Sequence, residues 1–136
     1  MPFVLDASIA GCWAFQDEQH PRADAALTRI RTEEAVVPNI WWFEVRHILV
    51  VNERRKRITE SDTTGFLRNL SRLPIRVDHD PDEAGVLRLA RTHRLSVYDA
   101  SYLELALREA MPVATLDTDL AAAARAEGAE LVGGGA

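Results

Sequence analysis

The sequence predicts an α/β protein with three α/β/α layers, in which helices cover both faces of a central parallel sheet of about five strands. Short apolar segments alternate along the chain with longer segments of helical periodicity, and this alternation is typical of a parallel sheet buried on both faces. The 136 residues contain no repeat, linker or low-complexity tract, so residues 1–132 are expected to form one domain. The glycine-rich residues 133–136 are expected to be a disordered tail.

The predicted strands are short apolar segments, and longer periodic segments separate them. The strands are residues 3–5, 35–37, 75–77, 112–116 and 130–132. The helices are residues 8–15, 20–33, 39–57, 59–73, 81–93, 97–110 and 118–127. In sheets of this kind ligands collect at the carboxyl ends of the strands, so the residues that follow each strand are the first candidates for a functional site.

The composition excludes several classes of protein. Hydrophobic residues make up 47% of the chain, which excludes general disorder, and the longest apolar runs are far too short to span a membrane. The N-terminus has neither a basic start nor a sustained apolar region, so no signal peptide is expected and the protein is predicted to be cytoplasmic. The four histidines lack paired metal-ligand spacing, which argues against zinc. The net charge of −5 argues against a generally basic nucleic-acid-binding surface unless a bound cation neutralises several carboxylates.

Two aspartates directly follow predicted strands. Asp6 comes after residues 3–5 and Asp117 after residues 112–116, which places both at the carboxyl edge of the sheet. For either one alone, the N-cap of the next helix is the preferred interpretation, since Asp is a favoured capping residue. Two such carboxylates on the same edge favour a functional site.

Glu44 lies inside the apolar arc of the long helix at residues 39–57, on a helical wheel of about 100° per residue. Glutamate is almost never fully buried unless it is paired. A neutral carboxyl group or a salt bridge to an arginine is therefore the structural alternative to a functional acid.

Asp99 raises a similar question in the helix at residues 97–110. It lies in the middle of the apolar arc of that helix, whereas Glu104 and Arg108 occupy the opposite side. Ser96 and Asp99 also form a capping-box pattern, and a carboxylate in the first turn suits the helix dipole. Taken alone, Asp99 is explained by capping.

Four carboxylates that converge without compensation would repel one another, raise their pKa values and destabilise the fold. A hard divalent cation such as Mg²⁺ or Mn²⁺ removes this repulsion, because it prefers oxygen ligands and keeps several waters. Such a site can polarise a phosphoryl oxygen and generate a hydroxide nucleophile. The predicted chemistry is therefore hydrolysis of phosphodiester bonds.

Four segments in order carry a resemblance to a known family. They are FVLDAS near the N-terminus, FEVRHIL on the long helix, YDASYLELA, and VATLDTDLAAAA. In these segments the chain resembles the PIN-domain ribonucleases, and among them the VapC toxins of bacterial toxin–antitoxin pairs, over about residues 3–132. The resemblance implies a PIN-like fold and a Mg²⁺- or Mn²⁺-dependent endoribonuclease that cleaves RNA. It also implies two protein partners, a second copy of the chain in a homodimer and a cognate antitoxin that blocks the active site.

The resemblance assigns roles to individual residues. The acidic metal centre would consist of Asp6, Glu44, Asp99 and Asp117. Ser8 matches the small hydroxyl residue that helps to bind metal or substrate, and Thr115 is expected to play a similar supporting part. Asp119 is a candidate metal ligand, with a solvated aspartate in the first turn of the helix as the equal alternative. His47 stands where many relatives carry Asn. It lies beside Ile40 on the helical wheel, so an approach to the edge of the site is one interpretation, and a packed, hydrogen-bonded histidine is the preferred one.

Other enzyme classes also begin with an aspartate at a strand end. A phosphatase of the haloacid-dehalogenase type needs a second Asp two residues later, where this chain has Ser8. A response-regulator receiver needs a lysine at a late strand end, and the only lysine is Lys56 on a predicted helix. The remaining alternative is a catalytically silent protein of the same fold that acts through protein–protein binding, and the presence of all four acids argues against it.

The end of the long helix carries the densest basic cluster, at residues 54–57, and Arg46 lies further up the same helix. Cations at a helix C-terminus suit the dipole, so a solvated helix end is the first interpretation and a phosphate-binding surface the second. Trp42 falls outside the main apolar arc and is predicted to be exposed and available to a partner.

Overall fold

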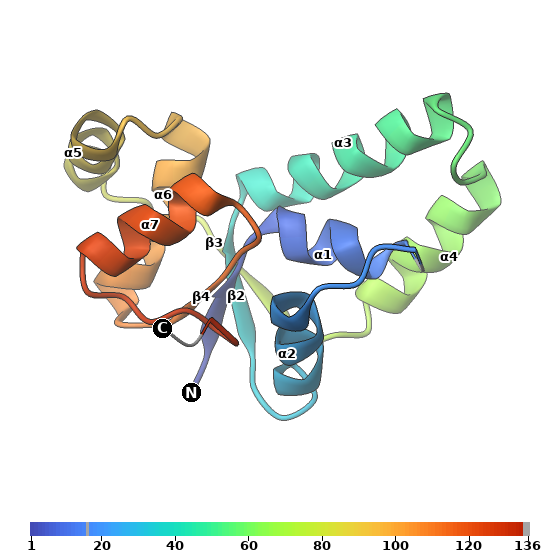
Figure 1. Ribbon diagram of the computed structural model, residues 1–136, viewed down its shortest axis with the longest axis horizontal. Coiled ribbons are helices and arrows are strands. Elements are labelled where there is room, and N and C mark those ends of the chain that lie inside the picture. Colours follow the sequence, from blue (N-terminus) through green and yellow to red (C-terminus); the bar gives the residue numbers. More distant parts are fainter. Residues whose placement is uncertain (16, 135–136) are drawn as a thin grey trace.

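The computed structural model describes residues 1–15 and 17–134, and its centre is a parallel sheet with strand order β3-β2-β1-β4 (Figure 1). The four strands are β1 (Phe3–Leu5), β2 (Ala35–Pro38), β3 (Ile75–Asp78) and β4 (Val113–Ala114). Each neighbouring pair is parallel, and the register places Val4 of β1 beside Val36 on one side and Val113 on the other. The predicted α/β class is confirmed.

Helices cover both faces of this sheet. In the described residues they are α1 (Ala7–Trp13), α2 (Pro21–Arg29), α3 (Ile40–Arg54), α4 (Glu60–Leu70), α5 (Glu83–His93), α6 (Val97–Glu109) and α7 (Thr118–Ala126). Helices α1 to α4 lie on one side of the sheet and α5 to α7 on the other (Figure 1), so the predicted three layers are present. No helix in this part of the chain is long and apolar enough to cross a membrane.

The fifth predicted strand is reduced to a single parallel bridge between Val113 and Leu131. The Val132 N–H donates to the Val113 carbonyl (2.9 Å), and the chain then turns at Gly133, which has a φ of +64°. A Cβ on Gly133 would come within 2.6 Å of the Ala25 side chain on α2, so only glycine fits this approach. Of the expected tail, Gly133 therefore approaches α2 and Gly134 lies beside Leu131, and residues 135 and 136 lie outside the described residues.

Strand β4 is also shorter than predicted, and the reason lies in the site that it carries. Thr115 and Leu116 leave the ladder, and the Leu116 amide donates to the hydroxyl of Ser8 instead of to a neighbouring strand (3.0 Å). The strand therefore ends where its backbone begins to bond to side chains at the carboxyl edge of the sheet.

The hydrophobic core surrounds the central strand β1, and α6 packs against this strand. Phe3, Val4 and Leu5 are fully buried, and each such large apolar side chain contributes roughly 1.5–3 kcal/mol when removed from water. On α6, Tyr102 and Leu103 are also fully buried against the sheet. A buried tyrosine hydroxyl normally needs a hydrogen-bond partner, and this requirement connects the core to the site described below.

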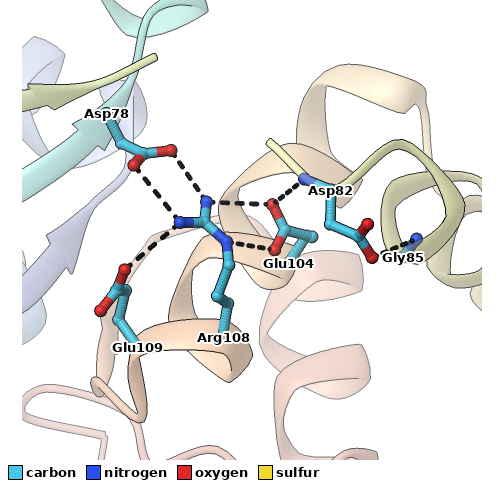
Figure 2. Close-up of polar contacts among 6 residues, drawn as sticks. All are labelled: Asp78, Asp82, Gly85, Glu104, Arg108 and Glu109. Atoms are coloured by element: carbon cyan, nitrogen blue, oxygen red, sulfur yellow. Dashed lines mark hydrogen bonds and ion pairs between the residues drawn. The ribbon is translucent and has the colours of Figure 1, made fainter. Parts of the chain in front are cut away.

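The side of α6 opposite to this core carries an arginine surrounded by carboxylates (Figure 2). Arg108 pairs with Glu104 (2.7 Å), Asp78 (2.8 Å) and Glu109 (3.3 Å). Glu104 also accepts the backbone N–H of Asp82, one residue before α5 (3.1 Å). This group, called here the Arg108 cluster, ties α6 to the end of β3 and the start of α5.

A candidate acidic active site at the carboxyl edge of the sheet

A cleft of about 710 Å³ opens at the carboxyl ends of β1 and β4, between α3 and the first turn of α6. All four acids of the predicted centre line it: Asp6, Glu44, Asp99 and Asp117. They come from the β1–α1 junction, α3, α6 and the β4–α7 junction, so four separate parts of the chain converge here.

Asp6 is the most deeply buried of these acids, with 5% of its surface exposed. It occupies the N-cap position of α1, yet its side chain makes no capping hydrogen bond there. Its Oδ2 instead accepts from the hydroxyls of Thr115 (2.6 Å) and Ser8 (2.7 Å). Burial raises the pKa of Asp6, the two hydroxyl donors oppose this rise, and the nearby charges of Glu44 and Asp117 add to it. The capping interpretation is therefore wrong for Asp6.

Ser8 and Thr115 hold the two strand ends together through Asp6. The Thr115 hydroxyl accepts the backbone N–H of Asp117 (3.0 Å) while it donates to Asp6. Ser8 does the same with the N–H of Leu116 (3.0 Å). Both side chains, predicted as supporting residues, therefore contact the first acid directly and position the loop that carries the last one.

Glu44 is half-buried on α3, and its Oε1 accepts a hydrogen bond from the Tyr102 hydroxyl (2.6 Å). In residues 1–15 and 17–134 no arginine or lysine forms a salt bridge with it, so the expected structural alternative of an arginine pair is absent there. Burial raises the pKa of Glu44, the Tyr102 bond opposes the rise, and the charge of Asp99 adds to it.

Asp99 takes part in only half of a capping box. Its backbone N–H donates to the Ser96 hydroxyl (3.0 Å), but the reciprocal bond from the Ser96 N–H to the Asp99 carboxylate is not formed within the described residues. Helix α4 shows the complete motif, in which Thr59 and Asp62 bond in both directions. Burial raises the pKa of Asp99, and the charges of Asp117 and Asp6 raise it further. The carboxylate of Asp99 thus faces the other acids.

Asp117 combines the two expected roles, because it caps α7 and lines the cleft. Its Oδ1 accepts the backbone N–H groups of Asp119 (2.8 Å) and Leu120 (3.0 Å). Asp119 itself is exposed in the first turn of α7 and does not line the cleft.

Tyr102 contacts the candidate site, although the apolar arc of its helix gives no sign of a polar role. It lies in that arc, but its hydroxyl donates to Glu44, 58 positions away in the chain. The available signal was its position three residues after Asp99, on the same face of α6, together with the need of a buried tyrosine hydroxyl for a partner.

His47 differs from its prediction. It is exposed on the wall of the cleft rather than packed in the core. The reason is that α3 turns Phe43, His47 and Val50 toward the cleft, while Val45 and Leu49 face the core. Trp42 is 48% exposed, as predicted.

The basic cluster at residues 54–57 lies at the far end of α3, about 15 Å along the helix from Glu44. Arg54, Arg55 and Lys56 are exposed. Arg57 is paired with Asp17 (3.2 Å) and Glu18 (3.1 Å). The cluster therefore does not contribute to the acidic cleft itself.

The donor atoms of the cleft suit a hard cation, although the side chains do not form a closed ligand set. Its acids and the two hydroxyls offer only oxygen, which is the ligand type that Mg²⁺ and Mn²⁺ prefer. Asp6, Glu44 and Asp99 all have raised pKa values in which burial and mutual repulsion act together, and a cation would relieve the repulsion. Within residues 1–15 and 17–134, no group of three or more His, Cys, Asp or Glu side chains is arranged so that it could hold a metal ion.

The fold and the site together define a class of protein: a three-layer α/β/α domain with acids that converge at the carboxyl edge of its sheet. The chain matches the model of the PIN domain over residues 3–126, and it belongs to this family.

Solved structures show the same fold. PAE2754 from Pyrobaculum aerophilum is 25% identical, with a TM-score of 0.69 over 90% of this chain and 87% of that one. The Mycobacterium tuberculosis toxin VapC20, described as cleaving the sarcin-ricin loop, is 16% identical, with a TM-score of 0.63 over 89% and 94%. FitAcB from Neisseria gonorrhoeae is 20% identical, with a TM-score of 0.59 over 98% of both chains. No curated protein sequence matches the chain.

Proposed function

We propose that this protein is a Mg²⁺- or Mn²⁺-dependent endoribonuclease that acts as the toxin of a toxin–antitoxin pair. The observation that carries the proposal is the convergence of Asp6, Glu44, Asp99 and Asp117 in one cleft, where no salt bridge within the described part of the chain compensates them. A fold that only needed stability would pair or neutralise such acids, because buried unpaired charges are costly.

In this proposal the four acids hold the metal, which when bound supplies electrostatic stabilisation of the phosphoryl group and a more acidic water. Asp6 would be the inner anchor, since two hydroxyl donors fix its Oδ2. Tyr102 would orient Glu44 through their hydrogen bond. The exposure of Asp119 outside the cleft supports its interpretation as a solvated residue of the first turn.

The test is RNA cleavage by the purified chain with Mg²⁺ or Mn²⁺, compared with the same reaction in EDTA. Asp6→Asn and Asp117→Asn should abolish cleavage. Asp80→Asn is the matched control, because it removes one exposed carboxylate from the loop before α5 and should leave the rate unchanged. Equal cleavage by the wild-type chain and Asp6→Asn would instead indicate a contaminating nuclease and a catalytically silent protein.

The toxin role is supported by the likeness in fold to VapC20, which is itself described as a toxin. In cells, expression of the wild-type chain should arrest growth, and expression of Asp6→Asn should not. An antitoxin encoded beside the gene should co-purify with the chain and restore growth. Light scattering should show a homodimer, and a monomer at every concentration would remove that part of the proposal.

A further inference from the structure

Arg46 is the cation that lines the acidic cleft, among the residues that the structure describes. Its guanidinium lies over the Trp42 ring, 3.9 Å from the ring centroid. Its Nη1 donates to the Trp42 carbonyl oxygen (3.1 Å). An arginine that is stacked and bonded in this way loses little further freedom when it binds a ligand.

No carboxylate compensates this arginine. In residues 1–15 and 17–134, other arginines near acids form ion pairs, but no Asp or Glu lies within salt-bridge distance of Arg46. Partial burial lowers the pKa of Arg46, yet a guanidinium stays protonated in proteins. Most of its five N–H donors are therefore free for an anion at the wall of the cleft.

Exposed aromatic rings stand beside this cation. Phe43 on α3 and Tyr98 in the first turn of α6 line the same cleft, and they are 64% and 58% exposed. Phe43 also packs edge-on against Trp42, with ring centroids 5.0 Å apart. Exposed aromatic side chains that gather at one cleft mark a binding surface rather than a folding requirement.

On the basis of the proposed ribonuclease function, we propose that Arg46 binds a non-scissile phosphate of the RNA while Phe43 and Tyr98 stack on its unpaired bases. Guanidinium groups bind phosphates through paired N–H donors. Aromatic rings stack only on bases that are not already stacked and paired in a duplex. Arg46, Phe43 and Tyr98 would therefore guide an unpaired strand into the acidic cleft along α3.

Charge complementarity favours this occupant over a protein segment. The acids of the cleft repel phosphates, so a nucleic acid needs a cation there. Arg46 lines the cleft and has no acid partner among residues 1–15 and 17–134. A protein segment would need apolar contacts but no anion on Arg46. The two occupants consequently differ in their dependence on the arginine charge and on aromatic stacking.

The first measurement uses the full chain with Asp6→Asn, so that RNA is bound but not cut. A short labelled single-stranded RNA and the duplex of the same sequence are titrated at several salt concentrations. Adding Arg46→Met should weaken single-strand binding roughly tenfold and reduce the slope of log affinity against log salt by about 0.7. Arg46→Lys should keep the slope and recover part of the affinity.

Arg72→Met is the matched control for charge. Arg72 is exposed, precedes β3 at the opposite, amino edge of the sheet, and forms no ion pair within the described residues. Its replacement removes the same charge and should leave both affinity and slope unchanged.

The second measurement separates stacking from general apolar contact. Phe43→Leu should weaken single-strand binding roughly tenfold with no change in salt slope, and Phe43→Trp should restore it. Duplex RNA should bind weakly and respond to neither change.

Each failure has a distinct meaning. If Arg46→Met behaves like Arg72→Met, or if the duplex binds as tightly as the single strand, the inference is overturned, and cleavage by the wild-type chain still supports the proposed function. Full RNA binding by Phe43→Leu would overturn the stacking role and identify the aromatic rim as a protein-binding surface. If the wild-type chain binds single strands through Arg46 but cuts none, the proposed function fails and the binding surface stands.

Discussion

Two groups of carboxylates lie on opposite sides of α6, and they differ in whether a cation compensates their charge. In the cleft, Asp99 faces other acids, and burial and repulsion raise its pKa. In the Arg108 cluster, the guanidinium lies between Glu104 and Asp78, and its hydrogen bond lowers the pKa of Asp78. Helix α6 therefore carries a carboxylate that repels other acids on one side and the ion-paired Arg108 cluster on the other (Figure 2 shows the Arg108 cluster).

The difference teaches that burial alone does not identify a functional acid. Glu104 is only 5% exposed, as deeply buried as Asp6, but its charge is matched by Arg108 and its Oε1 accepts a backbone N–H. Asp6 accepts from two hydroxyls and forms no salt bridge with the residues that the structure describes. The property that distinguishes a candidate functional acid from a structural one is whether a cation pairs with it.

Asp99→Asn should have the largest effect, and on activity rather than on stability. A bound metal contributes several kcal/mol to catalysis of this kind, so RNA cleavage should fall by at least about a hundredfold. The melting temperature without metal should stay the same or rise, because the change relieves carboxylate repulsion. A variant that is less stable but still cleaves would return Asp99 to a purely capping role.

Arg108→Met should have the converse effect. It leaves the buried Glu104 without a cation, and such a loss costs about 3 kcal/mol. Urea unfolding should show the destabilisation, while cleavage per folded molecule stays close to that of the wild-type chain. A large loss of activity at full folding would mean that the two carboxylate groups are coupled through α6.

Saturating Mg²⁺ should stabilise the wild-type chain by about 2.7 kcal/mol when its concentration is a hundred times its dissociation constant. The same addition should stabilise Asp99→Asn much less and Arg108→Met as much as wild type. Calorimetric titration at millimolar Mg²⁺ provides the affinity, and no binding there would count against the metal site.

The contributions of the cleft and of the Arg108 cluster to the free energy of unfolding should also change with pH in opposite directions. The pKa values of Asp6, Glu44 and Asp99 are raised in the folded state, so their contribution to stability is present below about pH 4 and is lost as the pH rises. The pKa of Asp78 is lowered, so its contribution is present above about pH 4 and is lost as the pH falls. Without metal, the stability advantage of Asp99→Asn over wild type should therefore grow with rising pH, and the cost of Arg108→Met should shrink with falling pH. Melting curves across pH with and without EDTA check both trends.

Tyr102→Phe should have the smallest effect. It removes the hydrogen bond to Glu44 and should cost about 0.5–1.5 kcal/mol of stability. Mg²⁺ affinity should drop as well, because Glu44 loses the donor that orients it. An unchanged affinity would show that the core does not position this acid.

The fold and the four acids could be predicted because their signals are local. A strand followed directly by Asp, as at Asp6 and Asp117, places a carboxylate at the sheet edge whatever the rest of the chain does. Helical periodicity likewise placed Glu44 and Asp99 on inward faces. These inferences needed no knowledge of which helices touch.

The remaining features depend on contacts between distant segments, which periodicity does not reveal. The Tyr102 bond to Glu44 joins α6 and α3. The exposure of His47 depends on which flank of α3 borders the cleft. Glu104 seemed to lie on the less apolar side of its helix, and only the approach of β3 and α5 buries it. The turn that follows the single bridge at Leu131 brings Gly133 close to Ala25 on α2.

The hydrogen bonds from Ser8 and Thr115 to Asp6 have a consequence for the order in which the site is assembled. Thr115 lies 109 positions after Asp6, and Asp117 comes later still, so the cleft draws on both the first and the last parts of the described chain. Domains fold as units, with the N-terminal part synthesised first. A nascent chain that ends before Thr115 therefore contains Asp6 and Ser8 but lacks the second hydroxyl donor to Asp6 and the last acid of the cleft. Under the proposed function, nuclease activity would therefore begin only when translation of the domain is nearly finished, and an antitoxin that is already present could bind the chain before that point.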